Sequence, residues 1–229
     1  MQWMDGAMND AWFEIRSTAF KNGELVYSFD QSIAGDPSYA GKFDPAANVK
    51  AGYCLGLAVQ WIGLRLRGKD FEWSGKRSLS PSATYAAASV HATYLKSFNE
   101  GHASLRSLLL SAEEVDTGAI NVALVPFGLK LSGETMSNKG RADAGKILGA
   151  ASTTRGIALM AWHGTWGAHA TAIDVRPAQQ TVNYFDANYG HFAFSSGPRF
   201  VAWFGTYLRL SSYESQLADR QALQVLGLA

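Results

Sequence analysis

Four strand-like runs follow one another in the second half of the chain, and this series restricts the available folds more than any other feature. The runs are GIALMAWH, AHATAIDV, TVNYFD and HFAFSS, and Gly, Pro, Asn or Gln residues between them supply turns. Such an uninterrupted series differs from the strict strand–helix alternation of a doubly wound fold. The sequence therefore predicts an antiparallel sheet over residues 156–196.

Helical patterns dominate the chain before these strands. Apolar residues recur at three and four positions from Gly52 to Arg67. Three further stretches predict helices, namely residues 82–98, HASLRSLLLSAEE and DAGKILGAAS. Ahead of them, WFEIRSTAF and ELVYSFDQS flank Asn22-Gly23, a pair typical of hairpin turns. We therefore expect an N-terminal β-hairpin followed by helices.

The segregation of helices and strands predicts the α+β class, with a helical half packed on an antiparallel sheet and a cleft between them. After the sheet, RFVAWFGTYLRL and ESQLADRQALQVL predict two closing helices. A length of 229 residues suits one domain. We expect a hairpin and loop over residues 1–47, a core over 48–210 and a C-terminal helix over 211–229.

The charge pattern argues against nucleic acid as a partner. Lys and Arg total 20 against 19 Asp and Glu, and no block of like charges forms a basic stripe. No apolar run approaches the roughly 20 residues of a membrane span. The N-terminus, MQWMDGAMND, lacks the apolar stretch of a secretory signal. We therefore expect a soluble protein that does not follow the general secretory route.

The single cysteine, Cys54, excludes an intramolecular disulfide. It falls in the first turn of the helix predicted from Gly52, where the helix dipole favours a thiolate. The backbone N–H of Cys54 could there donate to an oxyanion. The alternative is an inert thiol packed beside Leu57, because free cysteine is among the most buried residue types. The local pattern leaves both uses open.

His169 is the strongest candidate for a base to act with Cys54. It follows two glycines, in GTWGAHATAIDV, at the start of a predicted strand. His163 at a strand end and His191 after a turn are its rivals. A single histidine is more often a surface or core residue than a base, so the case for His169 depends on its partners.

Asp186 ends the apolar run TVNYFD and precedes the turn ANYG. A carboxylate at that strand tip could accept the second N–H of an imidazole and orient the ring. Adjacent antiparallel strands would bring His169 and Asp186 together. The alternative is a turn aspartate that binds its own backbone.

Three motifs taken together, GYCLGLAVQW, GAHATAIDV and YFDANYG, resemble the YopT-type (YopT- and AvrPphB-like) family of bacterial effector cysteine proteases, which has the papain-like fold. In that family a cysteine opens a helix, a histidine lies in a small-residue strand and an aspartate begins a turn with Asn, an aromatic residue and Gly. The resemblance extends over about residues 48–203. The matching positions are Cys54, Trp61, His169, Phe185, Asp186, Asn188, Tyr189 and Gly190, with Ala187 standing where the family usually has Pro.

The resemblance implies a cysteine endopeptidase with the catalytic triad Cys54, His169 and Asp186. It also implies an oxyanion site formed by the Cys54 backbone and Asn48, and no metal or organic cofactor. Family members act on proteins of another cell, in its cytosol, after delivery by a specialised bacterial secretion system, and a secretion chaperone is a possible further partner. Two alternatives use the same residues: a transglutaminase-like or other thiol acyltransferase, and a catalytically inert binding module.

Overall fold

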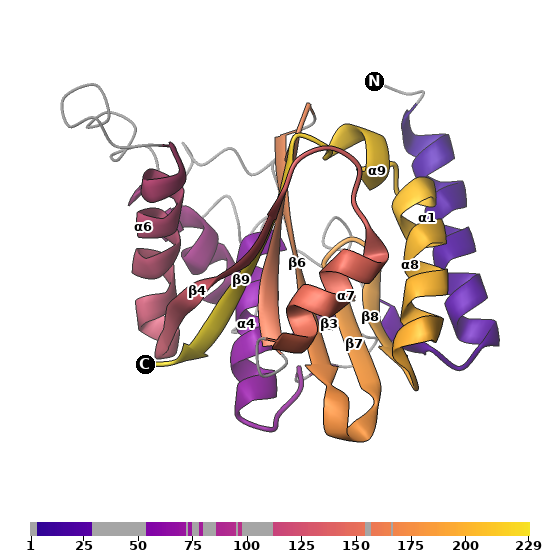
Figure 1. Ribbon diagram of the computed structural model, residues 1–229, viewed down its shortest axis with the longest axis horizontal. Helices are drawn as coiled ribbons and strands as arrows, with labels where there is room; N and C mark the ends of the chain where they lie inside the picture. Colours follow the sequence, from indigo (N-terminus) through magenta and orange to yellow (C-terminus); the bar gives the residue numbers. More distant parts are fainter. Residues whose placement is uncertain are drawn as a thin grey trace. The chain divides into compact units, whose positions relative to one another are not determined.

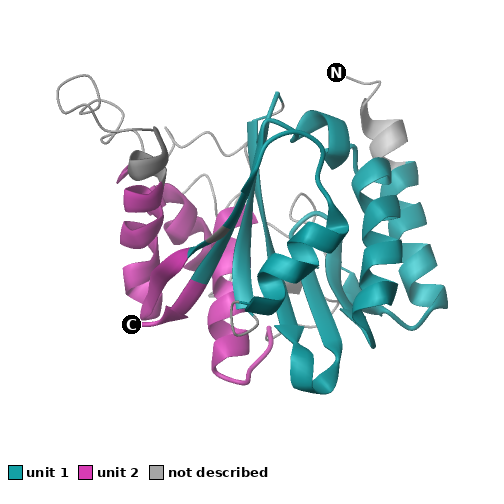
Figure 2. Ribbon diagram, in the orientation of Figure 1, with its two compact units in different colours: residues 1–30, 134–225 teal, residues 31–133, 226–229 magenta. Residues whose placement is uncertain are grey.

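The computed structural model describes residues 4–28, 54–71, 73–74, 78–79, 86–94, 96–97, 112–153, 157–165 and 167–229. The chain divides into two compact units, which Figure 2 colours separately. Unit 1 contains residues 1–30 and 134–225, and unit 2 contains residues 31–133 and 226–229. The predicted loop at 33–48 and most of the helix predicted at 102–114 lie outside the described residues.

Unit 1 contains the antiparallel sheet (Figure 1). In the described residues, seven strands pair in the order β1-β8-β7-β6-β5-β9-β4, and β9 and β4 continue into unit 2. Every pair from β1 to β9 is antiparallel. The strands are β1 (Leu25–Ser28), β4 (Leu129–Asn138), β5 (Ile157–Gly164), β6 (Gly167–Arg176), β7 (Thr181–Asp186), β8 (Gly190–Phe194) and β9 (Arg220–Leu228). The four predicted runs are β5 to β8, so that part of the fold prediction is confirmed.

Helices pack on one face of this sheet and form the main core with it. They are α1 (Met4–Lys21), α7 (Ala144–Thr153), α8 (Gly197–Leu210) and the single turn α9 (Tyr213–Gln216). Helices α1 and α8 lie side by side and contact each other (Figure 1). The face predicted for α8 is buried as expected, with Phe200, Trp203, Phe204, Tyr207 and Leu208 directed into the core. Side chains of this size each stabilise the fold by about 1.5–3 kcal/mol when fully buried.

The predicted N-terminal hairpin is wrong, because WFEIRSTAF belongs to helix α1 and only the second run contributes a strand, β1. The Asn-Gly pair does form a turn, but this turn ends the helix. Gly23 has a φ of 70°, its N–H donates to the Phe20 carbonyl at 3.0 Å, and the Glu24 N–H donates to the Ala19 carbonyl at 2.8 Å. This pair of bonds is the Schellman motif. Ile15 and Ala19 are buried four residues apart, at the helical period.

The predicted C-terminal helix over 211–229 is also wrong. After the single turn α9, residues 220–228 form strand β9, which lies between β5 and β4. Its residues Gln221, Ala222, Leu223 and Gln224 are all buried. A strand buried on both faces shows no alternation in its sequence, and Gln, Ala and Leu are good helix formers. Pairing with strands distant in the sequence therefore overrides the local preference.

Unit 2 includes helix α4 (Cys54–Leu66), a second helical segment at residues 86–94, helix α6 (Ala112–Leu124) with the 3-10 turn η2 (Val125–Phe127), and the two-stranded ribbon of β2 (Trp73–Ser74) and β3 (Ser78–Leu79). Helix α4 confirms the helix predicted between Gly52 and Arg67. It packs closely on the segment at 86–94 through Gly56, where a Cβ would lie only 1.8 Å from the carbonyl oxygen of Ala87. A backbone atom cannot move aside easily, so Gly56 is required for this contact.

We expect Gly56→Ala to lower the free energy of unfolding by about 3 kcal/mol, because the added methyl forces the two helices apart. Gly118 in α6 provides a matched control, since nothing lies within 4 Å of a Cβ placed there. Gly118→Ala is expected to stabilise the protein by up to about 1 kcal/mol through helix propensity. Urea unfolding of both variants measures the difference, and equal stabilisation by both would contradict the close packing of α4.

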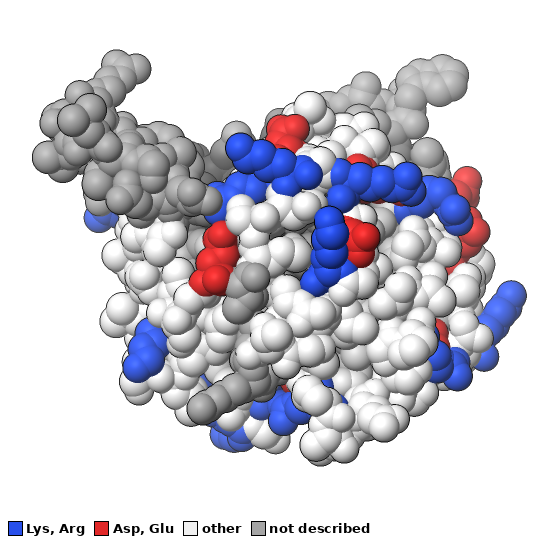
Figure 3. All heavy atoms as spheres, in the orientation of Figure 1, with Lys and Arg blue, Asp and Glu red and all other residues white. Residues whose placement is uncertain are grey.

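Acidic and basic side chains are mixed on the face of the protein seen in Figure 3. Unit 1 contains ion pairs between Arg220 and Glu134, at 3.2 Å, and between Arg141 and Glu214. None of the helices in the described part of the chain has the length and apolarity needed to cross a membrane.

Candidate active site

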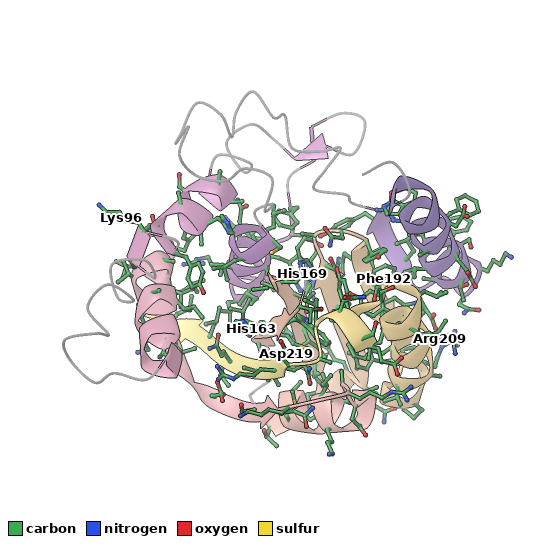
Figure 4. The ribbon with its side chains drawn as sticks, turned by 90° about the horizontal axis from the view of Figure 1, so that it is seen from above. Lys96, His163, His169, Phe192, Arg209 and Asp219 are labelled. Carbon is green, nitrogen blue, oxygen red and sulfur yellow. The ribbon has the colours of Figure 1, made fainter. Side chains whose placement is uncertain are left out.

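The register of two neighbouring strands brings His169 and Asp186 together. Thr171 faces Asp186 in the β6–β7 ladder, so His169, two residues earlier, lies on the same face and diagonally across. The His169 Nε2 is 3.1 Å from the Asp186 Oδ1. His169 is 9% exposed and Asp186 is 0% exposed. The structure thus pairs His169 with Asp186, as predicted from the sequence. His169 is labelled in Figure 4.

The turn after β7 holds the Asp186 carboxylate. The backbone N–H of Asn188 donates to Asp186 Oδ1 at 2.6 Å, and the Tyr189 N–H donates to the Asp186 carbonyl at 3.2 Å. Gly190 closes the turn with a φ of 128°, which other residues rarely adopt. The turn forms with Ala187, which is fully buried, at the position where the resembling family usually has Pro.

Helix α1 reaches the same turn. Arg16 is buried, and its Nε donates to the carbonyl oxygen of Tyr189 at 2.7 Å. The Arg16 guanidinium carbon lies 3.1 Å from the centroid of the Trp12 ring. The sequence pattern of this segment predicted a strand and therefore did not indicate that it reaches the site.

Tyr207 on α8 is a residue of the site that the sequence analysis missed. Its hydroxyl donates to Asp186 Oδ2, and the Tyr184 hydroxyl donates to the Tyr207 oxygen at 3.2 Å. Burial first, and then the charge of Asp186, raises the pKa of Tyr184, Tyr207 and Tyr213 well above the usual value near 10. These phenols therefore stay protonated at neutral pH. The sequence did contain one indication of this role, because a tyrosine on an otherwise apolar helix face needs a hydrogen-bond partner for its hydroxyl when it is buried.

The imidazole of His169 is oriented for proton transfer through its other nitrogen. A neutral ring that donates its Nε2–H to a carboxylate has its lone pair on Nδ1. The Tyr213 ring packs against the imidazole with 5.1 Å between centroids. The Tyr213 oxygen in turn accepts a hydrogen bond from Asn188 Nδ2 at 2.8 Å.

Within the described residues, no group of three or more His, Cys, Asp or Glu could hold a metal ion.

The rival histidines lie on the opposite face of the sheet from His169. His163 on β5 pairs with Ala168, one residue before His169, so its side chain points to the other side. Figure 4 labels both histidines on their neighbouring strands. His191 on β8 is also on that other face, and its Nε2 lies 3.1 Å from the amide oxygen of Asn183.

Cys54, which was predicted in the first turn of a helix that starts at Gly52, is the first residue of helix α4 and is 5% exposed. The N-terminus of a 13-residue helix favours negative charge on a side chain there. Trp61, two turns along α4, is fully buried. Asn48 lies outside the described residues. Cys54 belongs to unit 2, and the His169–Asp186 pair belongs to unit 1.

The architecture of helices and antiparallel sheet is the papain-like cysteine protease fold. The chain is similar to the crystal structure of the Pseudomonas avirulence protein AvrPphB, with a TM-score of 0.56 and 14% sequence identity. That similarity covers 82% of this chain and 99% of the other.

A peptidase family model described as Yersinia/Haemophilus virulence surface antigen matches residues 21–229. The chain belongs to this family of cysteine peptidases, and the YopT-type resemblance is confirmed. None of the curated proteins compared with the chain matches it. The family match begins at the last residue of α1, so nearly all of the helix that carries Arg16 precedes it.

Proposed function

We propose that this protein is a cysteine endopeptidase that hydrolyses peptide bonds in proteins of a target cell, and that Cys54, His169 and Asp186 form its catalytic triad. The observation that carries the proposal is the buried hydrogen bond between His169 Nε2 and Asp186 Oδ1, in a chain that belongs to a cysteine peptidase family. The N-terminal position of Cys54 on α4 supports its role as the nucleophile.

In the proposed reaction the thiolate of Cys54 attacks the carbonyl carbon of the substrate peptide bond. His169 has taken the thiol proton on Nδ1 and passes it to the departing amine, which leaves a thioester on Cys54. Water then attacks the thioester and gives a proton to His169, and the acid product departs from the Cys54 thiolate, which restores the thiolate–imidazolium pair. Asp186 keeps the imidazole oriented and favours its charged form. The backbone N–H of Cys54 and the side chain of Asn48 are the proposed oxyanion donors.

The two compact units would together make one catalytic domain, since Cys54 belongs to one and His169 and Asp186 to the other. We further propose that the protein is an effector that a specialised bacterial secretion system delivers, with a secretion chaperone as a candidate partner, and that it acts in the cytosol of the target cell. The family description as a virulence antigen and the similarity to an avirulence protein support this role.

Cleavage of a peptide library made from a target-cell proteome tests the proposal. We expect new acid termini that carry heavy oxygen when the reaction runs in heavy-oxygen water, because hydrolysis adds one oxygen atom from the solvent. A thiol acyltransferase would instead form amides when a primary amine is added. A binding module would give neither product, and either of these results would overturn the proposal.

A further inference from the structure

We infer that Tyr207 is a positioning residue for the reaction, which acts by holding the Asp186 carboxylate so that Asp186 can orient His169. This inference rests on the proposed function. It concerns a residue of α8 that lies 21 positions after Asp186 in the sequence.

The contacts of the carboxylate divide between its two oxygens. Asp186 Oδ1 accepts both the His169 Nε2–H and the Asn188 backbone N–H, at 3.1 and 2.6 Å. Asp186 Oδ2 accepts the Tyr207 hydroxyl. Because Asp186 has no exposed surface, bulk water has no access to replace a lost donor. Removing the Tyr207 hydroxyl therefore takes the donor from Oδ2 while both donors to Oδ1 remain.

Tyr207 is itself held in place. Its ring stacks on those of Trp203 and Phe204, with centroid separations of 4.9 and 5.4 Å. The Tyr184 hydroxyl donates to the Tyr207 oxygen, and a phenol that accepts a hydrogen bond is a better donor to the next acceptor. The raised pKa of Tyr207 keeps its proton available at neutral pH. The chain of donors thus runs from Tyr184 through Tyr207 to Asp186.

The Tyr207 hydroxyl has a role beyond the packing of its ring, because it limits rotation of the Asp186 carboxylate. A carboxylate bound through one oxygen can rotate about the bond to its Cβ, and rotation would turn Oδ1 away from the imidazole. A donor fixed on the helix at Oδ2 prevents that rotation. The hydroxyl thereby limits the motion of the His169 ring, on which proton transfer depends.

The test combines substitutions with a double-mutant cycle, using a library peptide that wild type cleaves and Cys54→Ala does not. Tyr207→Phe is expected to lower kcat about 10-fold and to leave KM within about twofold. Tyr184→Phe, one step further along the chain of donors, is expected to lower kcat about threefold. Tyr27→Phe is the matched control, because the Tyr27 ring packs on His191, which lies on the other face of the sheet. It is expected to leave kcat within about twofold.

The cycle separates positioning from a merely structural role. In the Asp186→Ala background, Tyr207→Phe should change kcat by less than about twofold, because its effect passes through the carboxylate. A full 10-fold loss in that background, or no loss in the wild-type background, would overturn the inference while leaving the proposed function intact. If Tyr207→Phe does not fold, Tyr184→Phe is compared in the same two backgrounds. A loss of kcat in the wild-type background alone supports the inference, and any other result overturns it. Absence of Cys54-dependent cleavage in wild type would overturn the proposed function and the inference together.

Discussion

Cys54→Ala is expected to abolish peptide cleavage, with kcat/KM falling on the order of 10³-fold or more. The substitution removes the atom that forms the thioester, and the chain has no second cysteine that could replace it. Such a loss corresponds to about 4 kcal/mol or more of transition-state stabilisation. The fold should persist, because the change removes a single sulfur atom from the first turn of α4. We expect a cost of about 1 kcal/mol in the free energy of unfolding.

Cleavage of the library peptide, together with urea unfolding, checks this prediction. The two uses of Cys54 give opposite patterns in these measurements. A nucleophile loses activity and keeps stability, whereas an inert core thiol keeps activity and loses stability. Retained cleavage in a destabilised Cys54→Ala variant would therefore remove Cys54 from the proposed mechanism.

Substitutions at Asp186 are expected to have the second-largest effect, and Asp186→Ala should be more harmful than Asp186→Asn. Alanine leaves three donors without their acceptor: the buried His169 Nε2–H and Tyr207 hydroxyl, and the partly buried Asn188 N–H. We expect kcat/KM to fall about 10³-fold, and stability to fall by about 1–3 kcal/mol, since unpaired buried groups are costly.

Asparagine retains one acceptor oxygen, which can still bind the His169 N–H and the Asn188 N–H. It places an amide NH₂ against the Tyr207 hydroxyl and lacks the charge that favours an imidazolium. We expect a loss of roughly 10–100-fold, or about 1.4–2.7 kcal/mol. In a serine triad the same exchange costs roughly 10⁴-fold, because the resting imidazole is neutral and takes up the wrong tautomer. A thiolate–imidazolium pair avoids this loss, since both ring nitrogens are then donors.

Values of kcat/KM for wild type and the two Asp186 variants, with thermal unfolding as the folding control, check this order. Equal and nearly complete inactivation of both folded variants would contradict the ion-pair mechanism. Full activity in both would exclude Asp186 from the triad.

The parts of the fold that were predictable carry a local pattern. Strands β5 to β8 are apolar runs of strand length that lie between clear turns, and α4, α7 and α8 show the helical period. The pairing of His169 with Asp186 followed from the same pattern, because consecutive antiparallel strands place residues near their shared end side by side. In each of these cases, neighbours in the sequence are also neighbours in the structure.

The parts that were missed depend on contacts that no local pattern records. Strand β9 is a strand because β5 lies beside it, and its sequence favours a helix. The Asn-Gly turn at Gly23 is compatible with a hairpin and with a helix end, and the packing of α1 on α8 favours the second. Tyr207 and Arg16 reach the Asp186 turn from opposite ends of the chain. A sequence shows that a buried phenol or guanidinium needs a partner, but the fold selects the partner.

The rate at which iodoacetamide alkylates Cys54, measured between about pH 5 and pH 9, tests most directly whether His169 activates the thiol. The protein contains one cysteine, so intact-mass spectrometry follows that residue without ambiguity. An ordinary thiol, with a pKa of about 8.5, loses reactivity about tenfold for each pH unit below that value. We expect wild-type Cys54 to stay reactive down to about pH 5.5, and His169→Ala to restore the steep decline of an ordinary thiol. The same steep decline in wild type and in His169→Ala would contradict the proposed thiolate–imidazolium pair.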